Sequence, residues 1–133
     1  MRVASWPVRG YAYGMRWLWV SCVVGALAVS FGAFGAHALK SRLSADMLAV
    51  YSTATQYHLV HAIVLFAIAL YSRATGASIT LPASLFLAGI VLFSGSLYLL
   101  AITGNRALGM ITPLGGLCFI AGWLTSGWWL SQR

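Results

Sequence analysis

The side chains best suited to chemistry in this chain are three histidines and a tyrosine next to two of them. His58 and His61 are one helical turn apart, and Tyr57 shares a face with His61 at a spacing of four residues. His37 precedes them across a short connecting segment, so all three imidazoles are expected at a similar depth. Imidazole binds zinc or copper and exchanges protons near neutral pH, so this histidine cluster is the first candidate functional site.

Three interpretations of the histidine cluster are open. The first is a metal site formed by His37, His58 and His61, although no full ligand motif accompanies them. The second is a proton or solute path that continues through further polar residues, namely Gln56, Tyr57, Ser94, Ser96 and Tyr98. The third, which we favour, is hydrogen bonding between helices, because no carboxylate within an apolar segment completes a proton relay.

Neither catalysis nor a cofactor is expected. The chain has no HExxH sequence, no phosphate-binding loop and no paired carboxylates, and Asp46 is its one acidic residue. Histidines on adjacent turns of one helix cannot hold both faces of a haem iron. The sequence therefore predicts a protein that is not an enzyme and that carries no cofactor.

The composition indicates that these side chains lie in a membrane. The chain is 61% hydrophobic and 7% charged, whereas soluble domains carry about 25% charged residues. Its formal charge is +7, but the basic residues stand singly at the ends of apolar runs, so no nucleic-acid interface is predicted and the lipid bilayer is the expected environment. Cys22 and Cys118 fall inside apolar runs, which predicts no disulfide.

Four apolar runs are long enough to cross about 30 Å of hydrocarbon, so the predicted fold is an all-α, four-helix membrane bundle. Ser44 and Asp46 suit the start of the second helix, whose first part is expected near the membrane interface. Residues 1–14 are expected to form an irregular cytoplasmic tail, although Met15 is an alternative start, and residues 15–133 the transmembrane domain. The predicted helices are about 17–36, 45–71, 81–102 and 107–130.

Arginine and lysine counts predict the orientation of the bundle. Five basic residues lie on the side of both termini and three on the other, so both termini are predicted to be cytoplasmic. A cleaved signal peptide ending near Ala36-His37-Ala38 is the alternative for the first helix, but its apolar run is longer than usual for such a peptide.

Small residues recur at helical spacing and predict close helix packing. In lipid, helices associate through close contact over small residues and through hydrogen bonds between helices. The glycines expected at such contacts are Gly25, Gly32, Gly35, Gly95, Gly115 and Gly122. Pro113 lies inside the fourth run and predicts a kink there.

Several motifs resemble one known family. They are Gly32-Ala33-Phe34-Gly35-Ala36-His37-Ala38-Leu39, Tyr51-x-Thr53-Ala54-x-x-Tyr57-His58-x-x-His61-Ala62, Leu92-Phe93-Ser94-Gly95-Ser96-Leu97-Tyr98, Thr112-Pro113-Leu114-Gly115-Gly116 and Ala121-Gly122-Trp123. Together they resemble the YgdD-like bacterial inner-membrane proteins of unknown function, which have small transmembrane relatives in animals. The resemblance implies a compact multi-pass fold in the bacterial inner membrane and no assigned activity.

Two functions from different classes are compatible with these features. The first is an accessory or stabilising subunit that binds a membrane-protein partner, or a homo-oligomer, through its small-residue faces. The alternative is a small transporter or channel with a histidine-lined polar path. We favour the first, because four short-looped helices leave no room for a recognisable reaction centre.

Overall fold

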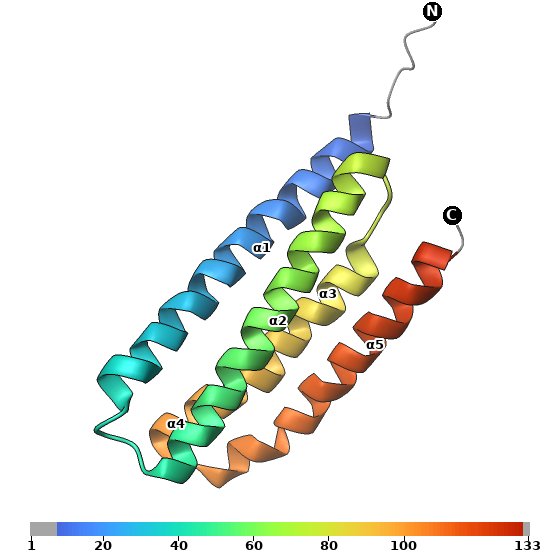
Figure 1. Ribbon diagram of the computed structural model, residues 1–133. Helices are drawn as coiled ribbons and strands as arrows, with labels where there is room; N and C mark the ends of the chain where they lie inside the picture. Colours follow the sequence, from blue (N-terminus) through green and yellow to red (C-terminus); the bar gives the residue numbers. More distant parts are fainter. Residues whose placement is uncertain (1–7, 132–133) are drawn as a thin grey trace, which may run out of the picture.

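The computed structural model describes residues 8–131, which form four long helical rods (Figure 1). The first rod is α1 (Val8–Phe34) with a π-helical turn η1 (Gly35–Leu39), and the second is α2 (Ala45–Thr75). The third rod consists of α3 (Thr80–Gly89), the π-helical turn η2 (Ile90–Ser94) and α4 (Gly95–Thr103). A 3-10 turn η3 (Arg106–Met110) leads into the fourth rod, α5 (Thr112–Ser131).

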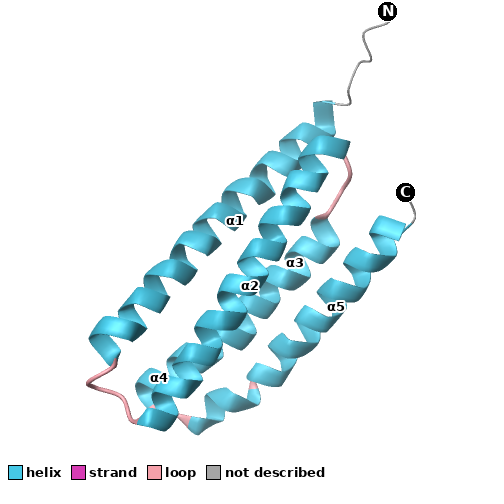
Figure 2. Ribbon diagram, viewed as in Figure 1, coloured by secondary structure: helices cyan, strands magenta, loops and turns pink. Residues whose placement is uncertain are grey.

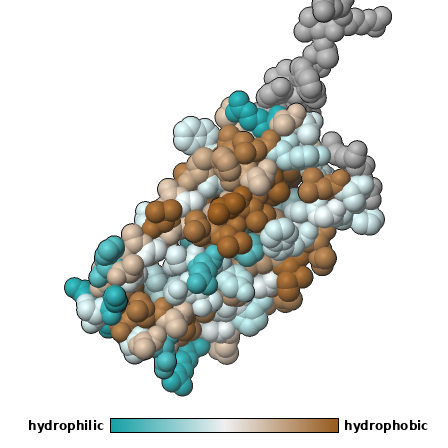
Figure 3. All heavy atoms as spheres, in the orientation of Figure 1, coloured by the Kyte–Doolittle hydropathy of each residue, from teal (hydrophilic) through white to brown (hydrophobic). Residues whose placement is uncertain are grey.

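Each rod is long and apolar enough to cross a membrane, which confirms the predicted four-helix membrane fold. The four candidate spans are Gly14–Leu39, Ala45–Thr75, Thr80–Thr103 and Arg106–Ser131. Their connections are short, and α1 begins at the same end of the bundle at which α5 ends (Figures 1 and 2). Large apolar side chains cover the sides of the bundle, as lipid contact requires (Figure 3).

The first helix begins earlier than the sequence predicted. Residues 8–14, assigned to an irregular tail, are helical, and residues 1–7 lie outside the described part of the chain. Pro7 precedes this helix in the sequence and no proline lies within Val8–Phe34, so no proline interrupts the backbone hydrogen bonds of α1.

Local signals at the ends of α2 explain its length. The Ser44 side chain accepts a hydrogen bond from the Met47 amide at 3.3 Å, and Asp46 lies in the first turn, where the helix dipole favours a carboxylate. At the other end Gly76 adopts a left-handed conformation with φ of 73°, which glycine reaches without steric cost. One continuous helix of 31 residues results.

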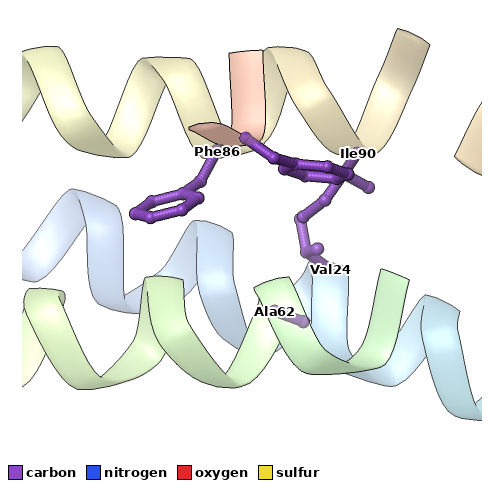
Figure 4. Close-up of a cluster of buried hydrophobic side chains, with 5 residues drawn as sticks. Val24, Ala62, Phe86 and Ile90 are labelled. Carbon is purple, nitrogen blue, oxygen red and sulfur yellow. The ribbon is translucent and has the colours of Figure 1, made fainter. Parts of the chain in front are cut away.

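The helix α2 is central to the bundle. It packs against α1 along its length and against α4, while α3 packs chiefly on α5. A central core cluster joins all four rods and consists of Val24, Ala62, Phe86, Ile90 and Phe119 (Figure 4). Two further clusters lie toward the ends, one around Tyr51 and Tyr98 and one around Leu65 and Ile79.

Glycines allow the helices to approach at specific points. A Cβ at Gly115 would overlap the Phe93 backbone, one at Gly122 would lie 2.9 Å from the Phe86 ring, and one at Gly35 would lie 2.5 Å from the Tyr51 ring. Gly32 faces the methyl group of Thr55. These four glycines therefore occupy contacts between helices.

Two of the glycines expected at packing contacts do not take that role within this chain, whereas Gly14 and Gly89, which were not expected there, do. A Cβ at Gly25 or Gly95 would meet nothing within 4 Å. Gly89, which the sequence analysis did not single out, lies so close to the Phe119 ring that a Cβ there would overlap it. Small-residue spacing alone does not show which side of a helix meets a neighbour.

Candidate functional site

His58 is buried among three rods and bonds to two of its neighbours. The side chain is 4% exposed, and its Nδ1 lies 3.3 Å from the Tyr98 hydroxyl on α4. The ring also forms a hydrogen bond with the backbone of Val24 on α1. A neutral imidazole carries one N–H, so it donates to only one of these partners at a time. His58 thus connects α2 with both neighbouring rods.

Hydroxyl groups extend this connection. The Tyr98 hydroxyl donates to Thr55 Oγ1 at 3.4 Å, and the Thr55 hydroxyl donates to the Tyr51 carbonyl at 3.1 Å. The Tyr51 hydroxyl donates to the Phe31 carbonyl on α1 at 2.9 Å. We call His58, Tyr98, Thr55 and Tyr51 the His58 network. It satisfies polar groups that lipid cannot satisfy.

His61 lies one turn further along α2 and has a different environment. Its side chain is 5% exposed, and its Nδ1 lies 2.8 Å from the carbonyl oxygen of Tyr57 in the same helix. The imidazole stacks on Phe119 of α5 with ring centroids 3.6 Å apart and an interplanar angle of 10°. The rings of Phe86 and Trp123 also lie next to the imidazole, with centroid distances of 5.8 and 6.5 Å from it. His61 is therefore held mainly by aromatic rings.

Tyr57 supports His61 through its backbone and not through its hydroxyl. The Tyr57 carbonyl is the group that bonds the His61 ring. The Tyr57 ring, 44% exposed, instead stacks on Phe93 with centroids 4.4 Å apart. Its spacing of four residues from His61 brings the two rings together at 5.9 Å.

His37 does not join the other two histidines. It is exposed in η1, where Gly35 and Leu39 take the buried positions, so the ring lies on the outward side of the turn. Within residues 8–131, no group of three His, Cys, Asp or Glu side chains comes together. The three imidazoles, which were expected at a similar depth, therefore do not meet at one place in the described chain.

The remaining polar residues of the predicted path separate into three environments. Ser96 shares a hydrogen bond with Thr112 at 2.8 Å and donates to the Phe93 carbonyl, so it fastens the third rod to the fourth. Gln56 is exposed on α2. Ser94, in η2, is fully buried, and its hydroxyl has no hydrogen-bond partner within the described chain.

Sequence reasoning missed three members of these networks, Thr55, Tyr51 and Thr112. A signal for two of them was present, because Tyr51, Thr55 and His58 follow one another at spacings of four and three along α2. Thr112 gave no such signal, since its partner Ser96 is on another rod.

Four membrane-spanning rods, two buried imidazoles and polar links between rods define a multi-pass helical membrane protein. Its one acidic side chain, Asp46, is exposed in the first turn of α2 and is not among the hydrogen-bond partners of His58 or His61. Residues 31–116 match the model of a family described as a protein of unknown function, DUF423. The chain belongs to this family of uncharacterised membrane proteins.

Relatives from several bacteria agree with this placement. A UPF0382 membrane protein of Staphylococcus saprophyticus is 48% identical over 109 residues, covering 79% of this chain and 91% of the relative. The UPF0382 membrane protein YwdK of Bacillus subtilis is 50% identical over 100 residues, covering 74% and 81%. A UPF0382 membrane protein of Haemophilus influenzae is 37% identical over 110 residues, covering 83% and 89%. No solved structure is significantly similar to this chain.

Proposed function

We propose that this protein is an interaction subunit of the bacterial inner membrane, which binds another transmembrane protein or a second copy of itself through the outward face of α2. In this proposal it performs no catalysis, both termini face the cytoplasm, and the YgdD-like proteins are its kin. The observation that carries the proposal is Gln56, an amide that points out of the bundle.

If α2 is centred in the bilayer, its length puts Gln56 within the hydrocarbon. A helix of 31 residues is about 46 Å long, whereas the hydrocarbon core is about 30 Å thick, so a centred α2 leaves about 8 Å outside at each end. Gln56 lies about 17 Å from the start of the helix. Its amide therefore faces lipid, where an unsatisfied polar group costs free energy and a partner helix supplies hydrogen bonds.

The surroundings of Gln56 suit a second helix. On the same outward side, Ala49, Ser52 and Thr53 are exposed, and the Thr53 hydroxyl is already bonded to the Ala49 carbonyl. Small side chains let helices approach closely, and glutamine both donates and accepts hydrogen bonds, so it pairs with an identical residue as well as with other polar groups. Further along this face Val60 and Ile63 continue as apolar residues.

Purification in a mild detergent tests the proposal. Wild-type protein should elute with a bound membrane protein or as an oligomer, identified by mass spectrometry and by light scattering. The variant Gln56→Leu should weaken this association by about 1 kcal/mol, whereas Val60→Leu, an apolar change on the same face, should leave it unchanged. A wild-type monomer with no partner would contradict the proposal, and so would equal association of the two variants.

A second candidate function, transport of protons or a small polar solute, is favoured by a different observation. The fully buried Ser94 hydroxyl lacks a hydrogen-bond partner among the described residues. Such a hydroxyl is a site at which a water or a passing polar solute would form a hydrogen bond. Proton flux into liposomes tests this function, and flux unchanged by the double variant His58→Ala and His61→Ala would exclude a histidine-lined path.

A further inference from the structure

The distribution of charge leaves one end of the bundle without a counter-charge from the protein. Arg16 and Arg73 lie at the end where α1 begins, and Asp46, the one acidic side chain of the sequence, lies at the opposite end of α2. Within the described chain, the Arg16 guanidinium forms no hydrogen bond or ion pair, whereas Arg73 contacts the Met15 sulfur at 3.5 Å. The described residues therefore leave the guanidinium donors of Arg16 available to an external anion.

A groove between α1 and α3 begins at this guanidinium. It has a volume of about 280 Å³ and is lined by Arg16, Trp17, Val20, Thr80 and Leu87. We call it the α1–α3 groove. Arg16 is exposed near the start of the candidate span Gly14–Leu39 and Thr80 at the start of the span Thr80–Thr103, so both are expected at the depth of lipid headgroups. Val20 and Leu87 are half-buried one and two turns deeper, at the depth of acyl chains.

We propose that the α1–α3 groove binds one anionic phospholipid, with the lipid phosphate on Arg16 and Thr80 and an acyl chain along Val20 and Leu87. Guanidinium groups bind phosphate with two parallel N–H donors, and a hydroxyl adds a third. The Thr80 hydroxyl lies 3.4 Å from that of Ser78, so two hydroxyls stand at the mouth of the groove. Trp17 supplies a rigid wall, because it packs on the cluster around Leu65 and Ile79.

The net charge favours an anionic headgroup over a zwitterionic one. The formal charge of +7 has no acidic counterpart at this end of the bundle, and anionic lipids are attracted to basic residues at the membrane surface. A zwitterionic lipid brings a second cation next to Arg16, which weakens the attraction.

Titration of delipidated full-length protein with phosphatidylglycerol or phosphatidylcholine, followed by native mass spectrometry, tests this assignment. The wild type should bind one phosphatidylglycerol more tightly than phosphatidylcholine. The variant Arg16→Gln should weaken phosphatidylglycerol binding about fivefold, and the variant Leu87→Trp, which fills the groove without changing charge, should weaken binding of both lipids.

Two matched controls separate the groove from general electrostatic attraction. Arg73→Gln removes the same charge at the same end but outside the groove, and Arg106→Gln removes it at the opposite end. Neither should change the dissociation constant of the first phosphatidylglycerol. The assignment is wrong if Arg73→Gln and Arg16→Gln weaken binding equally, if Leu87→Trp binds both lipids as the wild type does, or if the two lipids bind the wild type equally.

Discussion

The surroundings of His58 and of His61 differ although the two residues are one turn apart on the same helix. His58 is held by hydrogen bonds that reach α1 and α4, while His61 bonds only to its own helix and lies against aromatic rings of α3 and α5. Hydrogen bonds thus hold α2 against α1 and α4 at His58, and aromatic contacts hold α2 against α3 and α5 at His61. The same side chain performs two structural tasks, and its neighbours decide which one.

The aromatic contacts with α3 and α5 should be more sensitive to added side-chain volume than the hydrogen-bonded contacts with α1 and α4. In Gly115→Ala the new methyl group would meet the Phe93 backbone, which cannot rotate away as a side chain can, so α5 must move. We expect the free energy of unfolding to fall by about 3 kcal/mol, measured by equilibrium unfolding in mixed micelles. Gly25→Ala adds the same methyl group in open space and should not destabilise the protein; a similar loss in both variants would contradict the contact.

Replacing each histidine by phenylalanine tests the difference directly. His58→Phe leaves the buried Tyr98 hydroxyl without its imidazole partner and should cost about 2 kcal/mol of unfolding free energy. His61→Phe keeps a flat ring against Phe119, and the Tyr57 carbonyl remains available to its helix, so we expect a change below about 0.5 kcal/mol. Equal losses in the same unfolding assay would remove the distinction between the two sides.

A double-mutant cycle measures the contribution of the contact between His58 and Tyr98. If His58 and Tyr98 bond each other, the combined variant His58→Phe with Tyr98→Phe should lose less stability than the two single variants together. We expect a coupling free energy of about 1 kcal/mol from the four unfolding measurements. Additive losses would show that the 3.3 Å contact contributes nothing.

A smaller loss than that of His58→Phe is expected for the link from Tyr51 to α1. Tyr51→Phe removes the hydroxyl that donates to the Phe31 carbonyl at 2.9 Å, and should lower the unfolding free energy by about 0.6 kcal/mol. Tyr57→Phe serves as its control, since the exposed Tyr57 ring contributes stacking and its hydroxyl bonds to nothing in the described chain. A larger loss in the control would mean that the Tyr57 hydroxyl has a role that this structure does not show.

The spans and the burial of both α2 histidines could be predicted from sequence, because length, hydropathy and helix caps are local properties. Ser44 and Asp46 fixed the start of α2 as expected. The separation of His37 from the other histidines could not be predicted from sequence, since it depends on which side of η1 meets α2. Spacing gives the relative angle of residues on one helix but not the direction in which that helix faces.

Contacts between rods were the least accessible to sequence reasoning. Gly25 and Gly35 fit the same small-residue pattern, yet one is open and the other lies against Tyr51. The bond between Ser96 and Thr112 likewise requires the third rod to present Ser96 toward α5. That orientation depends on a π-helical turn, which side-chain periodicity does not reveal.

The π-helical turn Ile90–Ser94 also predicts where chains of this family can vary in length. Such a turn accommodates one more residue than a regular helical turn, so it behaves as a single inserted amino acid. Deleting one residue there would convert the π turn into a regular α-helical turn and keep Tyr98 next to Thr55 and His58, whereas deleting one residue within a regular α-helical segment would rotate everything downstream by about 100° around the axis. Within the rods, a one-residue deletion should therefore be tolerated in this apolar stretch and excluded from the regular α-helical segments.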